Sequence, residues 1–223
     1  MPINTVRFSS FNRAVLTAVA VATLGLSLQA CAPLVVGGVA ATGVMVAVDR
    51  RTSGTQLEDE AIELKAASQV RDALGDKGHI NFNSFNRQLL LTGEVPTEAD
   101  KAKVERVAAQ VENVRSVVNE LAVLGNSSLT QRSSDTLVSG RVKAAIVDAK
   151  DLSIHAFDVI TERGTVYLMG RVTQREANRV TDVVRSVQGV QRVVRVFEVI
   201  SEEELARMQP KQPAKTDQPK AGD

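Results

Sequence analysis

The chain has 223 residues, with 27 basic and 26 acidic side chains and a formal net charge of +1. This balance gives no bulk attraction for nucleic acid, and an aromatic content of 3% without tryptophan supplies few base-stacking platforms. The length fits one or two domains, and a lone cysteine excludes a disulfide framework, so the fold must depend on its hydrophobic core.

The N-terminus has the layout of a secretory signal. Arg7 and Arg13 stand before an apolar run of residues 14–28, and small residues follow. The run is shorter than the roughly 20 residues that a membrane span needs. The LQAC sequence at residues 28–31 resembles the lipobox of bacterial lipoproteins, in which the signal is cut before the cysteine. This resemblance implies a signal peptide over residues 1–30 and a lipidated N-terminus at Cys31.

Residues 31–54 then form a tether rich in Gly, Ala and Val. Cutting before Cys31 would remove two arginines and no acid, which leaves 25 basic and 26 acidic residues in the mature chain. The tether glycines form no phosphate loop, because no Gly-Lys-Ser/Thr follows them. Thr52–Thr55 is interpreted as linker.

An internal repeat follows the tether. Leu91-Thr92-Gly93-Glu94-Val95 matches Leu168-Met169-Gly170-Arg171-Val172, 77 positions later. Asn113-Val114-Arg115-Ser116-Val117 matches Gly189-Val190-Gln191-Arg192-Val193, 76 positions later. Two copies of one structural unit therefore explain most of the mature chain.

The first copy, residues 55–124, begins with a helix. Its inward positions at helical spacing are Ile62, Ala66, Val70 and Ala73. Strands are expected at 80–82 and 89–95 around a turn at 85–87, then a helix beginning at 96–98, and a third strand at 117–124.

The second copy, residues 134–200, follows a linker at 125–133 and repeats this order. Ser134 or Asp135 would cap a helix whose inward residues are Val138, Val142, Ala145 and Ala149. Residues 154–161 and 166–172 would form a hairpin, 173–187 a helix, and 193–200 the last strand. The order αββαβ, twice, predicts an α+β protein with two helices on a three-stranded mixed sheet in each half.

The repeated motifs resemble the BON domain of bacterial osmotically inducible and nodulation proteins. Its marks are a Leu-x-Gly-x-Val at the end of the second strand and a Gly-Val-x-x-Val before the third. The first copy has Asn113 where the family has glycine, and Asn tolerates left-handed backbone next best. Two such copies behind a lipobox are similar to dual-BON outer-membrane lipoproteins, whose lipid-anchored member collects at division sites.

Three glycines are expected to be structural. Gly93 and Gly170 would lie where a strand meets a helix and a side chain would crowd the junction. Gly189 follows a helix and fits C-cap chemistry.

No catalytic or metal-binding pattern accompanies the repeat. His79 and His155 have no ligand spacing around them and are interpreted as solvated histidines at strand edges. Nucleophile motifs are absent, and the carboxylates fall on exposed helix faces. We therefore expect no enzyme activity, metal, cofactor or small-molecule substrate.

The first helix of the second copy is the candidate binding surface. Leu137 would be an apolar residue near the surface, next to Val138, with Arg141 one turn on and Lys143 flanking it. An apolar wedge with basic neighbours suits an anionic bilayer surface. The resemblance implies the same partner, since the lipoprotein group is thought to bind anionic phospholipid through its second BON domain. Packing of Leu137 against the first domain is the alternative.

The last strand has two apolar faces. Val193, Phe197 and Val199 lie on one, and Val194, Val196 and Ile200 lie on the other. One face would cover the helices, and the other would pack on the partner domain or on another chain. Residues 201–223 are expected to form a short helix, begun by a capping box at Ser201, and then a disordered tail.

The function expected from these features is that of a non-enzymatic outer-membrane lipoprotein. It would lie on the periplasmic face, bind anionic phospholipid through the second domain and support envelope integrity. The alternative is an adaptor that docks an envelope protein assembly or a peptidoglycan-remodelling machine through the exposed sheet face.

Overall fold

The computed structural model describes residues 49–208, which belong to one compact unit. The predictions of a signal peptide, of lipidation at Cys31, of most of the tether (residues 31–48) and of the disordered tail fall on residues outside the described part.

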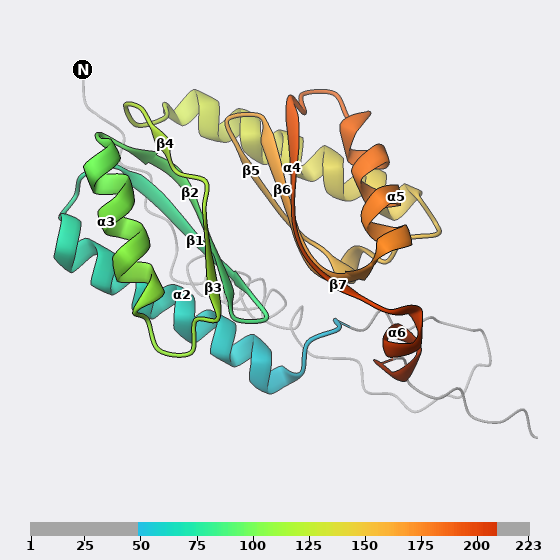
Figure 1. The fold of residues 1–223 in the computed structure, drawn as a ribbon. Coiled ribbons are helices and arrows are strands. Elements are labelled where there is room, and N and C mark those ends of the chain that lie inside the picture. The colour runs from blue at the N-terminus through green and yellow to red at the C-terminus, as the bar shows by residue number, and fades with distance from the viewer. Residues whose placement is uncertain (1–48, 209–223) are drawn as a thin grey trace, which may run out of the picture. The chain divides into compact units, whose positions relative to one another are not determined.

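The first repeat contains two helices and a sheet (Figure 1). Its elements are α2 (Ser53–Leu74), β1 (His79–Phe85), β2 (Gln88–Val95), α3 (Glu98–Ala109), β3 (Ser116–Asn119) and β4 (Ala122–Val123). β1 pairs antiparallel with β2, and β3 and β4 both pair parallel with β2. The third strand expected over 117–124 is thus one strand with a break at Glu120 and Leu121.

The second repeat has the same order with a continuous last strand. Its elements are α4 (Leu129–Asp148), the 3-10 turn η2 (Ile154–Ala156), β5 (Asp158–Glu162), β6 (Thr165–Thr173), α5 (Gln174–Arg185) and β7 (Arg192–Ile200), followed by α6 (Glu202–Met208). β5 pairs antiparallel with β6, and β6 pairs parallel with β7. The α+β architecture with two mixed sheets confirms the prediction from the sequence.

The first helix of each repeat begins earlier than predicted. The Thr52 hydroxyl accepts a hydrogen bond from the Thr55 amide, and the Ser128 hydroxyl accepts one from the Gln131 amide. These hydroxyls satisfy amides that have no partner within the helix. The predictions of a linker at Thr52–Thr55 and of a cap at Ser134 or Asp135 were therefore wrong. Ile154–Ala156, expected in a strand, forms the 3-10 turn instead.

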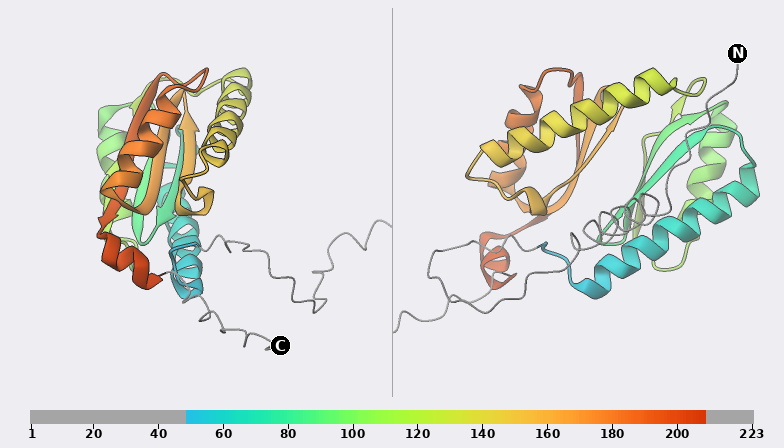
Figure 2. Two further views of the ribbon diagram at one scale, coloured as in Figure 1. Left: turned by 90° about the vertical axis from the view of Figure 1, so that its right-hand side faces the viewer. Right: turned by 180° about the vertical axis from the view of Figure 1, so that it is seen from behind.

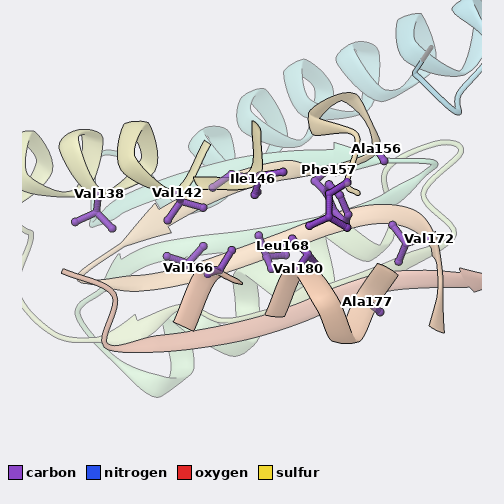
Figure 3. Packing of buried hydrophobic residues seen from close by; sticks show 13 residues of the cluster. Val138, Val142, Ile146, Ala156, Phe157, Val166, Leu168, Val172, Ala177 and Val180 are labelled. Carbon is purple, nitrogen blue, oxygen red and sulfur yellow. The ribbon is translucent and has the colours of Figure 1, made fainter. Parts of the chain in front are cut away.

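Each repeat has its own hydrophobic core between two helices and one sheet face. Side chains alternate along the central strands, so Leu89 and Leu91 of β2 face α2 and α3, while Val166 and Leu168 of β6 face α4 and α5. Figure 3 shows Val138, Val142 and Ile146 of α4 above Val166 and Leu168. Figure 2 shows α4 and α5 on the same face of the β5–β7 sheet.

The opposite faces of the two sheets share a third apolar cluster. It joins residues of both repeats: Phe85, Leu90, Tyr167, Met169 and Val196, with Val118, Ile160 and Val194 partly buried beside them. The two-faced last strand is thus explained, because Val193 and Phe197 pack toward the helices and Val194 and Val196 pack on the first repeat. Val199, expected to share the face of Val193, is 55% exposed.

The glycines of the repeated motif have a different role from the one predicted. Gly93 and Gly170 lie inside β2 and β6, not where a strand meets a helix. A Cβ on Gly93 would collide with the carbonyl oxygen of His79, and one on Gly170 with that of Ala156. Close approach of the preceding backbone therefore excludes a side chain at both positions.

Candidate functional site

The inward row of α4 consists of core residues. Val138 is 4% exposed, and Val142 and Ile146 are fully buried. A Cβ on Gly189, which has a φ of +99°, would meet Cγ2 of Val138. The prediction that Val138 contacts phospholipid was therefore wrong, because its side chain fills the space beside Gly189. Ile146 takes the inward place that the sequence analysis gave to Ala145.

The outward side of α4 carries a continuous stripe of apolar and small residues. Leu137, Gly140, Ala144 and Val147 follow one another at spacings of three, four and three, so they lie on one helix face. All four are exposed, with Leu137 at 62% and Val147 at 57%. Exposure of Leu137 decides against its packing on the first domain. We call these four residues the α4 stripe.

A third large apolar side chain extends the α4 stripe. Leu129 is 79% exposed and lies 18 residues before Val147, which is five full turns of helix. The sequence analysis missed both residues. The 3.6-residue period marks Val147 as a stripe residue once the inward row is fixed, whereas Leu129 joins the stripe only because Ser128 caps the helix and α4 begins at Leu129.

Basic side chains flank the α4 stripe on both sides. Arg141 follows Gly140 and Lys143 precedes Ala144, so they project about 100° to either side of the stripe. Both are exposed. The Arg141 guanidinium donates a hydrogen bond of 3.4 Å to the carbonyl of Gln188, which leaves its other N–H groups available. An apolar stripe with a cation on each side has the pattern of an interfacial helix.

The sheet face that the sequence analysis proposed as a docking surface for a protein partner is buried. Val196 is 5% exposed and belongs to the cluster shared by the two repeats. Docking of an adaptor's partner on this face would require the repeats to separate. The prediction of an exposed sheet face was therefore wrong.

The two histidines differ from one another in their surroundings. His155 is exposed in the 3-10 turn, whereas the His79 side chain is 26% exposed and faces the fully buried Glu94. Burial lowers the pKa of His79, and the positive charge of Arg132 adds to this, against the opposing effect of Glu94. His79 stands on the edge strand β1, as expected, but its Nδ1 is buried, so the imidazole is only partly solvated.

Burial also raises the pKa of Glu162, and the nearby carboxylates of Glu94 and Asp135 add to this rise. Glu162 ends β5 and accepts a hydrogen bond of 2.9 Å from the Asn81 amide of the first repeat. Two carboxylates and an imidazole thus meet where the repeats join. Between residues 49 and 208, no helix combines the length and apolar character required to cross a bilayer.

The two repeats match a known family. Residues 59–125 and 134–201 each match the BON domain, and this chain belongs to the BON domain family. The chain is 37% identical over 175 residues to the outer membrane lipoprotein DolP of Haemophilus influenzae, covering 78% of this chain and 90% of that protein.

Two further relatives are more distant. The chain is 30% identical to a 21 kDa hemolysin of Actinobacillus pleuropneumoniae, covering 69% of this chain and 80% of that protein. It is 27% identical to the osmotically-inducible protein Y of Escherichia coli, covering 63% of this chain and 72% of that protein.

Proposed function

We propose that this protein is a non-enzymatic outer-membrane lipoprotein, anchored through Cys31, whose second BON domain binds anionic phospholipid and supports envelope integrity. The α4 stripe is the observation that carries the proposal. Its exposed leucine and valine offer apolar area to the acyl boundary, and Arg141 and Lys143 offer charge to anionic headgroups.

Similarity to a relative named as an outer membrane lipoprotein supports the anchoring part of the proposal. The LQAC sequence at residues 28–31, which resembles a lipobox, also supports it. A mature lipoprotein is already held at the membrane by its acyl chains. The α4 stripe would then determine which lipid composition the second BON domain binds.

Vesicle binding of residues 46–223 tests the lipid surface without the anchor. The expected result is co-sedimentation with phosphatidylglycerol vesicles and little with phosphatidylcholine vesicles. Leu137→Asp should lower the partition at least roughly tenfold, because burial of a leucine side chain contributes about 1.5–3 kcal/mol. Combining Arg141→Glu and Lys143→Glu should remove the preference for anionic lipid, and added salt should weaken the wild-type binding.

A matched control lies on the first helix of the first repeat. Leu64 of α2 is 74% exposed, so Leu64→Asp removes a similarly exposed leucine outside the second domain. This variant should bind vesicles like the wild type. Equal loss in Leu64→Asp and Leu137→Asp, or equal binding of the wild type to neutral vesicles, would contradict the assignment of the surface to α4.

A further inference from the structure

A cluster of potential metal ligands lies where the two repeats join. His79 begins β1 and is the cross-strand partner of Glu94 in β2, and Glu162 ends β5 of the second repeat. One ligand atom from each of the three residues lies within 4.8 Å of the others. The set therefore combines an imidazole nitrogen with two carboxylate oxygens, contributed by both domains.

The imidazole nitrogen in this cluster has no hydrogen-bond partner. Nδ1 of His79 is buried and is without a partner among the described residues. It lies 3.7 Å from Oε2 of Glu94, beyond hydrogen-bond distance. A buried polar atom without a partner calls for an explanation, such as an ion or an ordered water.

Neighbouring groups hold the two carboxylates and leave other lone pairs available. Arg163 donates to Oε1 of Glu94 at 2.9 Å, and the Ser127 amide donates to Oε2 at 3.1 Å. The Asn81 amide donates to one oxygen of Glu162 at 2.9 Å. Outer contacts of this kind fix the orientation of ligating carboxylates in metal sites.

The charges around the cluster leave a net negative charge that a bound cation would neutralise. Glu94 is 0% exposed and Glu162 is 8% exposed, and Asp135 adds a third buried carboxylate nearby. Among the described residues, Arg163 pairs with Glu94 at 2.9 Å, and the positive charge of Arg132 acts on Glu162. Three carboxylates against two guanidinium groups leave one negative charge uncompensated while His79 is neutral, and neutral imidazole is the form that binds metal.

A second buried polar atom lies along the same face of the sheet. Thr92 is 0% exposed, and its Oγ1 has no partner among the described residues. It is two residues before Glu94 on β2 and is the cross-strand partner of Asn81. Its hydroxyl could hold a water that completes the coordination of an ion, as open sites with three protein ligands do.

We propose that His79, Glu94 and Glu162 form a site for a divalent transition-metal ion, with Zn²⁺ as the best match, that joins the two BON domains. Imidazole with carboxylates suits zinc and its first-row neighbours, whereas Ca²⁺ and Mg²⁺ take oxygen ligands. Because the ligands come from both repeats, bound metal stabilises their association.

Metal titration of the detergent-purified full chain, stripped with a chelator and dialysed, tests this site. Calorimetry should give one Zn²⁺ per chain at this site. A roughly 100-fold excess over Kd should raise Tm by about 5–10 °C. Co²⁺ should give a visible absorption band, and Ca²⁺ should bind much more weakly than Zn²⁺.

Matched variants separate the site from other metal binding. His79→Ala and Glu162→Gln should each lower Zn²⁺ affinity by about 100-fold and abolish the Co²⁺ band. His155→Ala, which removes the chain's other histidine, should change neither. Glu162→Gln keeps the side-chain shape, and its Tm in EDTA shows whether it folds. Absence of Zn²⁺ binding, unchanged binding in Glu162→Gln, loss in His155→Ala, or equal affinity for Ca²⁺ overturns the proposal.

Discussion

The carboxylate of Asp135 accepts a backbone hydrogen bond from Arg163 at 2.9 Å and another from Gly164 at 2.9 Å. A helix residue thereby holds the tip of the β5–β6 hairpin, where both turn residues have positive φ. The first repeat contains the equivalent hydrogen bonds. Asp59 of α2 accepts from the amides of Asn86 and Arg87 at 2.9 and 2.7 Å.

Removal of the Asp135 carboxylate should destabilise the second repeat. Asp135→Ala leaves two amides of a tight, largely buried turn without partners, so we expect a loss of about 2–4 kcal/mol in the free energy of unfolding. Asp148→Ala, an exposed change on the same helix, should stay within about 0.5 kcal/mol of the wild type. Urea denaturation measures both. Similar stability of the two variants would show that the hairpin does not depend on the hydrogen bonds to Asp135.

A methyl group at Gly93 should be far more harmful than one at Gly140. Gly93→Ala places a Cβ against the backbone of β1 at a φ of +107°, which should cost more than about 2 kcal/mol. Gly140 has open space around its Cβ position within α4, so Gly140→Ala should stabilise by about 0.5–1 kcal/mol. Thermal unfolding of the two variants checks the opposite signs, and a stable Gly93→Ala protein would disprove the close approach.

The ion pair of Arg50 with Glu176 should make stability depend on pH. Its atoms are 2.7 Å apart, and the side chains are 10% and 6% exposed. Burial pushes the pKa of Glu176 upward, but hydrogen bonds from Arg50 and the Thr173 amide outweigh burial and leave this pKa below its ordinary value. A lowered carboxyl pKa gives stability that is present above the unfolded pKa and is lost as pH falls through the folded pKa.

Arg50→Ala should therefore cost roughly 3 kcal/mol at neutral pH, because it leaves a buried carboxylate without its partner. The difference in unfolding free energy between wild type and variant should shrink as the pH falls from 7 to about 3. Arg175→Ala, which removes a side chain that is 60% exposed, provides the comparison and should show little effect at either pH. A constant difference across the pH range would contradict the role of Glu176.

A single tryptophan can report directly on the α4 stripe, because the chain has none. Leu137→Trp should bind phosphatidylglycerol vesicles more tightly than the wild type, since an indole ring favours the membrane interface. Its fluorescence should shift to the blue when vesicles are added. Leu64→Trp on α2 should show no such shift, and matching shifts in the two variants would place the lipid contact elsewhere or on both helices.

The sequence by itself determined the repeated unit, the order of its helices and strands, and most of the inward row of each helix. Periodicity is a local property, so Ile62, Ala66 and Val70 mark a buried face without knowledge of the fold. The same period places Leu137, Arg141 and Lys143 on the outside of α4. It also could have excluded Val138 as a contact residue, because Val138 belongs to the inward row.

Only the tertiary structure decided what the second faces of the sheets meet and which polar residues gather there. His79 and Glu94 stand 15 positions apart in the sequence, and Glu162 lies in the other repeat, so no spacing rule connects them. Their approach depends on strand register and on the packing of one sheet against the other. Both are long-range relationships, which arise when the repeats fold and cover each other's apolar surface.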